Sequence, residues 1–77
     1  MDLRHAQAER EAGNLQAAVI EPSPNGNGWM VLFIDGEGAR AVLTDHTGTD
    51  KLYHTLDHAG EAAREAGFEA VRIEERF

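Results

Sequence analysis

The chain has 77 residues, enough for one domain with a small core, because a domain of this size removes only about 60% of its unfolded surface from water. Its net charge is −7, from 14 acidic and 7 basic side chains, and it contains no cysteine. Disulfides, thiolate nucleophiles and cysteine-ligated zinc are therefore excluded. The basic residues are spread singly along the chain, so a nucleic-acid backbone would meet a mostly acidic surface.

The N-terminal stretch, MDLRHAQAER, is charged and lacks the apolar core that a signal peptide needs. Its pattern predicts a helix over about 3–12, with Asp2 as the N-cap and Gly13 placed to end the helix in a left-handed conformation. The apolar face of this helix is thin. The helix is therefore the weaker of two in the chain and depends on docking against the rest of the protein.

Four short segments after this helix favour β-strands: 16–21, 29–34, 39–44 and 51–55. Prolines and glycines in PSPNGNG, DGEG and DHTGTD separate these segments and predict turns. The segment 29–34, WMVLFI, is the longest apolar run, and it is far shorter than the roughly 20 residues that cross a bilayer. We expect a soluble, cytoplasmic protein without a membrane partner.

The firmer helix is predicted over about 56–66. Thr55 is a good N-cap, Asp57 lies in the first turn beside the positive helix end, and Gly67 suits the position after the helix end. The face expected to pack on the sheet consists mostly of alanine: Leu56, Ala59, Ala63 and Ala66. The outward face carries polar side chains: His58, Glu61, Arg64 and Glu65.

The last predicted strand is 69–75, EAVRIEE, in which apolar and charged residues alternate. Val71 and Ile73 are expected to point inward, and Arg72 and Glu74 outward. The chain is thus predicted to form a single α+β domain over 1–77. It would contain an antiparallel sheet of four to five short strands, the firm helix and the weaker N-terminal helix.

The segment 29–34 is apolar on both faces and needs cover on both. The helix over 56–66 is expected to cover one face. The other face would meet the N-terminal helix, folded over or against the sheet edge, or a second copy of the protein. An unbroken apolar run has no alternation, so the sequence does not indicate which side chains face the helix.

Four histidines are the only residues that suggest chemistry. His46, His54 and His58 lie among aspartates, and imidazole with carboxylate is a plausible zinc set. However, His54 precedes the predicted N-cap Thr55, whereas His58 falls on the outer helix face, so the spacing does not bring them together. Ser23, the only serine, lies between prolines with no histidine nearby. We predict no catalytic residue, no metal, no cofactor and no enzymatic activity.

Aromatic residues suggest a binding surface on the sheet. Trp29 and Phe33 are four residues apart on one strand and therefore share a face. With Arg40 and Tyr53 they would form a platform on which bases or apolar side chains stack. The alternative is that the two aromatic residues pack inside the core.

From Trp29 onward, the sequence resembles small uncharacterised accessory proteins of proteobacterial plasmids and integrated mobile elements. The shared features are the Trp-led strand, the glycine hairpin, the junction TGTDKLYHTLDHA and the exit AREAGFEAVRI. This resemblance implies a cytoplasmic protein and supplies no catalytic residues. The order of helix, three strands and helix also resembles double-stranded RNA-binding domains, but the final strand and the absence of a lysine cluster at 56–58 argue against that kinship.

These observations favour a non-catalytic protein–protein interaction or accessory module. Such a module would bind a protein partner or a second copy of itself through the apolar face around Trp29 or an open strand edge. The alternative is a nucleic-acid-associated protein of plasmid or mobile-element maintenance that uses the aromatic sheet face.

Overall fold

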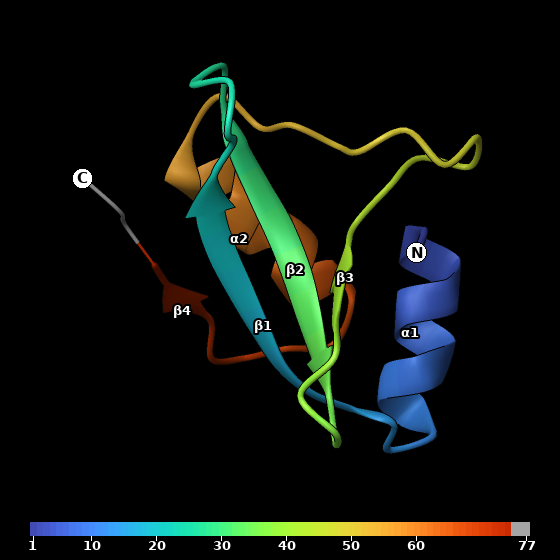
Figure 1. Ribbon diagram of the computed structural model, residues 1–77. Coiled ribbons are helices and arrows are strands. Elements are labelled where there is room, and N and C mark those ends of the chain that lie inside the picture. Colours follow the sequence, from blue (N-terminus) through green and yellow to red (C-terminus); the bar gives the residue numbers. More distant parts are fainter. Residues whose placement is uncertain (75–77) are drawn as a thin grey trace.

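The computed structural model describes residues 1–74. Its elements, in chain order, are α1 (Leu3–Glu11), β1 (Leu15–Pro22), β2 (Trp29–Asp35), β3 (Arg40–Val42), α2 (Leu56–Glu65) and β4 (Arg72–Ile73), as Figure 1 shows. The predicted α+β class and both predicted helices are confirmed. None of the helices in this part of the chain is long and apolar enough to cross a membrane.

The four strands form one sheet in the order β3-β2-β1-β4. β1 pairs antiparallel with β2, and β2 with β3, whereas β4 runs parallel to β1. The prediction of a purely antiparallel sheet was therefore wrong. The reason is the connection, because α2 carries the chain across the whole sheet and returns it at the far edge, which is the usual way to join parallel strands.

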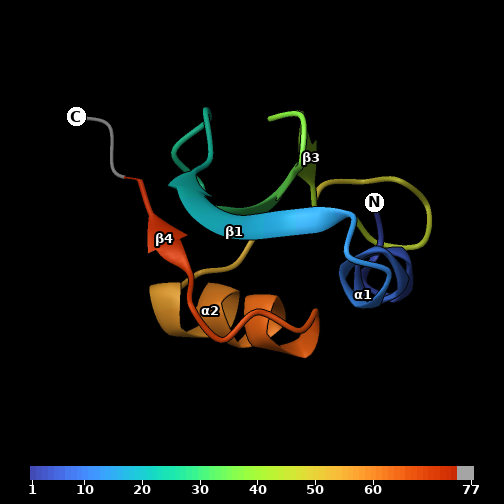
Figure 2. The ribbon, with the colours of Figure 1, turned by 90° about the horizontal axis from the view of Figure 1, so that it is seen from below.

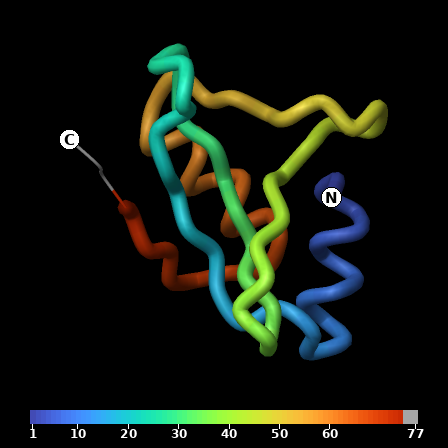
Figure 3. Tube along the Cα trace, viewed as in Figure 1, coloured from blue at the N-terminus to red at the C-terminus, as the bar shows by residue number. Residues whose placement is uncertain are grey.

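Three predicted strands differ from the structure, and the first of these, 39–44, is reduced to Arg40–Val42. The segment 51–55 is not a strand, because only Tyr53 pairs there, through a single bridge to Trp29. The chain from 43 to 55 instead passes along one end of the sheet (Figure 3). The last strand is reduced from 69–75 to Arg72–Ile73, and residue 75 lies outside the described residues.

α2 covers one face of the sheet (Figure 2). Its predicted N-cap is confirmed, since the Thr55 side chain accepts a hydrogen bond from the His58 backbone N–H. The buried helix residues are all small: Ala59, Gly60, Ala62 and Ala63. Small side chains let the helix lie close to the sheet, so the large residues of β2 fill the space between the two layers.

The face of β2 that meets α2 carries Val31 and Phe33, both fully buried. Phe33 stacks on Phe68, which follows α2, with the ring centroids 5.7 Å apart. Arg10 of α1 lies over the other ring of this pair, its guanidinium carbon 4.5 Å from the centroid of Phe68. A cation above an aromatic face is a favourable contact that also anchors α1 to the core.

α1 lies beside the β3 edge of the sheet (Figure 1). The backbone extends this contact, because the N-terminal ammonium donates to the Val42 carbonyl at 3.3 Å and the Thr44 N–H donates to the Met1 carbonyl at 2.8 Å. The N-terminal helix does dock at a sheet edge, but the expectation that it covers the second face of 29–34 was wrong, because its buried Ala6 packs into the core on the α2 side. The backbone contact of Met1 occupies the Val42 carbonyl and the Thr44 N–H, at one end of the β3 edge.

Among residues 1–74, no helix covers the second face of the sheet, and long charged side chains lie across it. Arg40 on β3 reaches Glu21 on β1 at 2.7 Å and Glu74 after β4 at 3.5 Å. Because β2 lies between β3 and β1, this bridge passes over the middle of β2, where Leu32 faces the same side. Leu32 and its neighbour Val19 are buried although neither belongs to the core beneath α2. The apolar stems of long charged side chains can cover such residues.

Candidate functional site

The structure divides the four residues of the predicted aromatic surface between different places. Phe33 is fully buried beneath α2, and Arg40 lies on the opposite face of the sheet, bound to Glu21. Trp29 and Tyr53 do remain together, joined by two backbone hydrogen bonds of 2.8 and 2.9 Å. Both are half-buried and pack against the core. The four side chains therefore do not share one surface.

The strand alternation explains this division. Phe33 pairs with Ala41 of β3, and Arg40 pairs with Ile34, which neighbours Phe33 on β2. Since successive residues of a strand point to opposite faces, Arg40 lies on the face away from Phe33. Burial also raises the pKa of Tyr53, with the charge of Glu65 as the second cause.

The open feature of the molecule is the β4 edge, where no further strand follows among residues 1–74. The Glu74 N–H donates to the Ile20 carbonyl at 2.9 Å, toward β1. Backbone groups of consecutive strand residues point in opposite directions within the sheet. The N–H and C=O of Ile73 therefore point away from β1, toward the outer edge.

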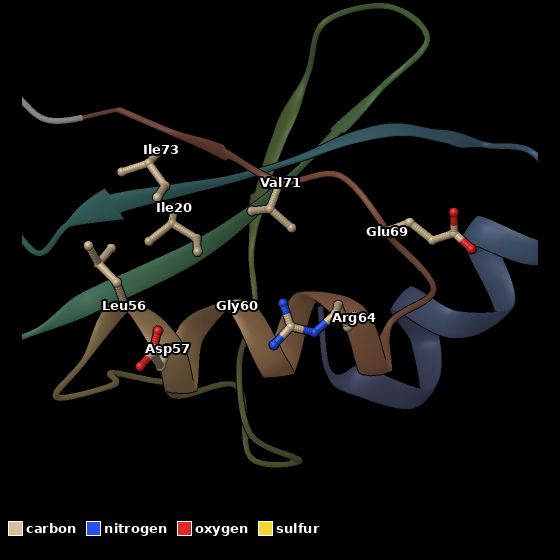
Figure 4. Close-up of a pocket in the computed structure, with 8 residues that line it drawn as sticks. All are labelled: Ile20, Leu56, Asp57, Gly60, Arg64, Glu69, Val71 and Ile73. Carbon is tan, nitrogen blue, oxygen red and sulfur yellow. The ribbon is translucent and has the colours of Figure 1, made fainter.

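A groove of about 320 Å³ runs between β4 and α2, on the helix side of this edge. Figure 4 shows its more apolar end, where Ile20, Leu56 and Ile73 gather with Val71 beside them, and where the Asp57 carboxylate lies next to Leu56. Among residues 1–74 two large hydrophobic residues are exposed, and Ile73, at 49%, is the more exposed of the two. It takes the inward face predicted for it, but it lies beyond the flank of α2, so the helix does not cover it.

The other end of the groove is polar. Arg64 projects from α2, and Glu69 lies at the far end, as Figure 4 shows. The groove passes over Gly60, where the nearest atom to an added Cβ would be a guanidinium nitrogen of Arg64, at 3.6 Å. A side chain at this position would fill the middle of the groove. The glycine thus keeps the space between helix and strand open.

The histidines do not converge. His5 lies 3.7 Å from Glu9 within α1, and the other three lie at exposed positions of different segments. Among residues 1–74, no three side chains of His, Cys, Asp or Glu come together in a way that could hold a metal ion. Asp45 binds its own turn, accepting from the side chain and N–H of Thr47 and the N–H of Thr49, and these bonds lower its pKa.

The sequence predicted the candidate binding surface around Trp29 or at an open strand edge, and it did not point to this groove. One sequence feature that belongs to the groove is EAVRIEE, the last predicted strand, in which Ile73 was expected to point inward. Gly60, within a helix otherwise rich in alanine, is a second feature. Neither feature shows that β4 lies at an edge, because that depends on where α2 returns the chain.

Comparison with known proteins gave no match to a family model, a curated protein or a solved structure. The resemblance to accessory proteins of plasmids and mobile elements therefore stays a prediction.

Proposed function

We propose that this chain is a cytoplasmic, non-catalytic protein-interaction module that binds one extended protein segment along the β4 edge. The observation that carries the proposal is Ile73, a large apolar side chain half-exposed on the outermost strand. The same residue directs its backbone N–H and C=O outward. An added strand would pair with that backbone, and its alternate side chains would enter the groove beside α2.

The two ends of the groove set the chemistry of the segment. The end formed by Ile20, Leu56 and Ile73 suits an apolar side chain, because its burial removes apolar surface of both partners from water. Arg64 and Glu69 at the other end suit a polar side chain. A segment in which apolar and polar residues alternate would therefore satisfy both the edge and the groove.

The β3 edge does not offer the same site. There the residue Met1 already bonds to Val42 and Thr44, and α1 lies alongside. The contrast between an edge that is partly occupied and an edge that is open among residues 1–74 supports β4 as the binding element.

The proposal is tested with a displayed library of random linear peptides, selected on the full chain. Selected peptides are expected to lose binding to an Ile73→Arg variant, which puts a charge where the apolar contact forms. Leu52→Arg is the matched control, because Leu52 is the other exposed large hydrophobic residue among residues 1–74, at 41%, and does not line the groove. Peptides that bind both variants and the wild type equally would overturn the proposal.

The nucleic-acid alternative has less support. It required Trp29, Phe33, Arg40 and Tyr53 on one face, and Phe33 is buried while Arg40 is engaged with two carboxylates. It predicts binding to single-stranded oligonucleotides that weakens steeply with salt. We expect no such binding, and a salt-sensitive complex lost in Arg40→Glu would favour the alternative instead.

A further inference from the structure

The outer strand has a self-complementary charge pattern. Arg72, Ile73 and Glu74 follow one another, with Arg72 and Glu74 on the open face and Ile73 on the helix face. If two such strands run antiparallel with Ile73 opposite Ile73, each Arg72 lies opposite a Glu74 of the other strand. Antiparallel registers centred on Arg72 or on Glu74 would place like charges opposite each other, which is destabilising.

We propose that the segment bound at the β4 edge is β4 of a second copy of this chain, with Ile73 on the two-fold axis. This inference rests on the proposed function, since it names the partner of the same edge. The pairing would join the two sheets into one continuous sheet. Such an arrangement closes after two copies, as two-fold contacts do.

The backbone of Ile73 fits this axis. Its N–H and C=O point outward, because the neighbouring Glu74 N–H is directed at Ile20 of β1. Two residues of this orientation that face each other in antiparallel strands exchange two hydrogen bonds. The N–H of each Ile73 would then donate to the carbonyl oxygen of the other, and the symmetry makes the two bonds equivalent.

The side chains fit on both faces. Residues directly opposite in antiparallel strands lie on the same side of the sheet, so the two Ile73 side chains would meet on the helix side, next to Leu56 and Val71 of each groove. On the open face, Arg72 and Glu74 now lie 3.2 Å apart within one chain. In the dimer the same two groups would also reach Glu74 and Arg72 of the second copy.

The strand is only two residues long, so the contact is smaller than the roughly 1,600 Å² of a standard interface. We therefore expect a weak dimer, which is seen by sedimentation equilibrium as the protein concentration rises from micromolar to millimolar. Ile73→Arg is expected to stay monomeric throughout, whereas Leu52→Arg is expected to dimerise like the wild type. A wild type that is monomeric throughout, or an Ile73→Arg variant that dimerises like it, would overturn the inference.

Charge reversal tests the register itself. R72E alone and E74R alone each put like charges opposite one another and are expected to weaken self-association at least tenfold. When the two variants are mixed, every cross-strand pair is again of opposite sign, so the mixture is expected to form a heterodimer. Circular dichroism of each variant checks that it is folded. Folded variants whose mixture does not associate would contradict the proposed register.

The outcomes separate this inference from the proposed function. The chain could prove monomeric while selected peptides bind the wild type and fail to bind the Ile73→Arg variant. In that case the β4 edge is a binding site, and the second copy is not its partner. If the wild type dimerises and the mixed charge variants recover the dimer, both proposals are supported.

Discussion

The two faces of the sheet are covered by different means. On one face, α2 packs its small residues against β2, and Phe33 and Val31 are fully buried in the core. On the other face, Leu32 is buried where charged side chains cross the sheet, from Arg40 to Glu21 and Glu74. A small domain can therefore bury a strand that is apolar on both faces without a third layer.

This difference matters because the helix on one face and the ion pairs on the other respond differently to salt and pH. A helix buries its apolar face whatever the salt concentration, since the hydrophobic effect is not electrostatic. Ion pairs at an accessible surface weaken with salt and with protonation of the carboxylates. The face beneath α2 is thus expected to account for most of the stability, and the open face to be the adjustable part.

The largest expected effect comes from the helix-covered face. Phe33→Ala removes the ring that stacks on Phe68 and is expected to cost about 3–5 kcal/mol in the free energy of unfolding. Leu32→Ala on the open face is expected to cost about 2–3 kcal/mol, because the flexible side chains above it can settle into the space. Urea unfolding measures both. A greater loss for Leu32→Ala would reverse the ranking of the two faces.

A loss of this size can unfold a small domain, whose total stability is of the order of 5 kcal/mol. Phe33→Leu keeps much of the volume and is expected to cost about 1–2 kcal/mol. It gives a measurable value if Phe33→Ala does not fold, with Leu32→Val as its counterpart on the open face.

The next effect separates apolar cover from charge. Arg40→Ala removes both and is expected to lower the urea midpoint, by less than Phe33→Ala does. Arg40→Met keeps an apolar stem above Leu32 and is expected to lower the midpoint less than Arg40→Ala. Added sodium chloride should reduce the difference between wild type and Arg40→Met. Equal midpoints for the two variants would mean that only the charge of Arg40 stabilises this face.

The smallest effect is on the pH dependence of stability. The hydrogen bond with Glu21, and then the charges of Arg40 and Arg72, lower the pKa of Glu74 below its ordinary value of 4.5. A carboxyl whose pKa is lowered by folding adds stability above its unfolded pKa and loses it as the pH falls through the folded value.

Urea unfolding between about pH 6 and pH 3, on either side of the ordinary carboxyl pKa, tests this prediction. Glu74→Gln should flatten part of the decline toward acid. Asp45→Asn, which removes another carboxyl of lowered pKa far from this face, should flatten a separate part. If Glu74→Gln leaves the slope unchanged, the bridge across the open face adds no acid-sensitive stability.

Much of the local structure could be predicted because it depends on neighbouring residues. Asp2 and Thr55 were recognised as N-caps, and both accept the backbone hydrogen bond of a cap. The small inward face of α2 followed from its spacing of alanines. These signals act within one or two turns of chain, so the sequence contains them in full.

The candidate site could be predicted only in part. The alternation of apolar and charged residues predicted that Ile73 points inward. Its side chain is nevertheless half-exposed, because it lies beyond the part of the sheet that α2 covers. Trp29 and Phe33 were correctly placed on one face, but an unbroken apolar strand does not indicate that this face is the one that α2 buries. Arg40 was assigned to the same surface because the register of β3 against β2 was not known.

The amino-acid sequence by itself determined the helix caps, the turns and the apolar character of β2, because these depend on residues close together in the chain. Only the tertiary structure decided that β4 runs parallel to β1 at an open edge, and that Arg40 reaches Glu21 and Glu74 across the sheet. Both depend on the path of α2 and on strand register, which bring together residues far apart in sequence.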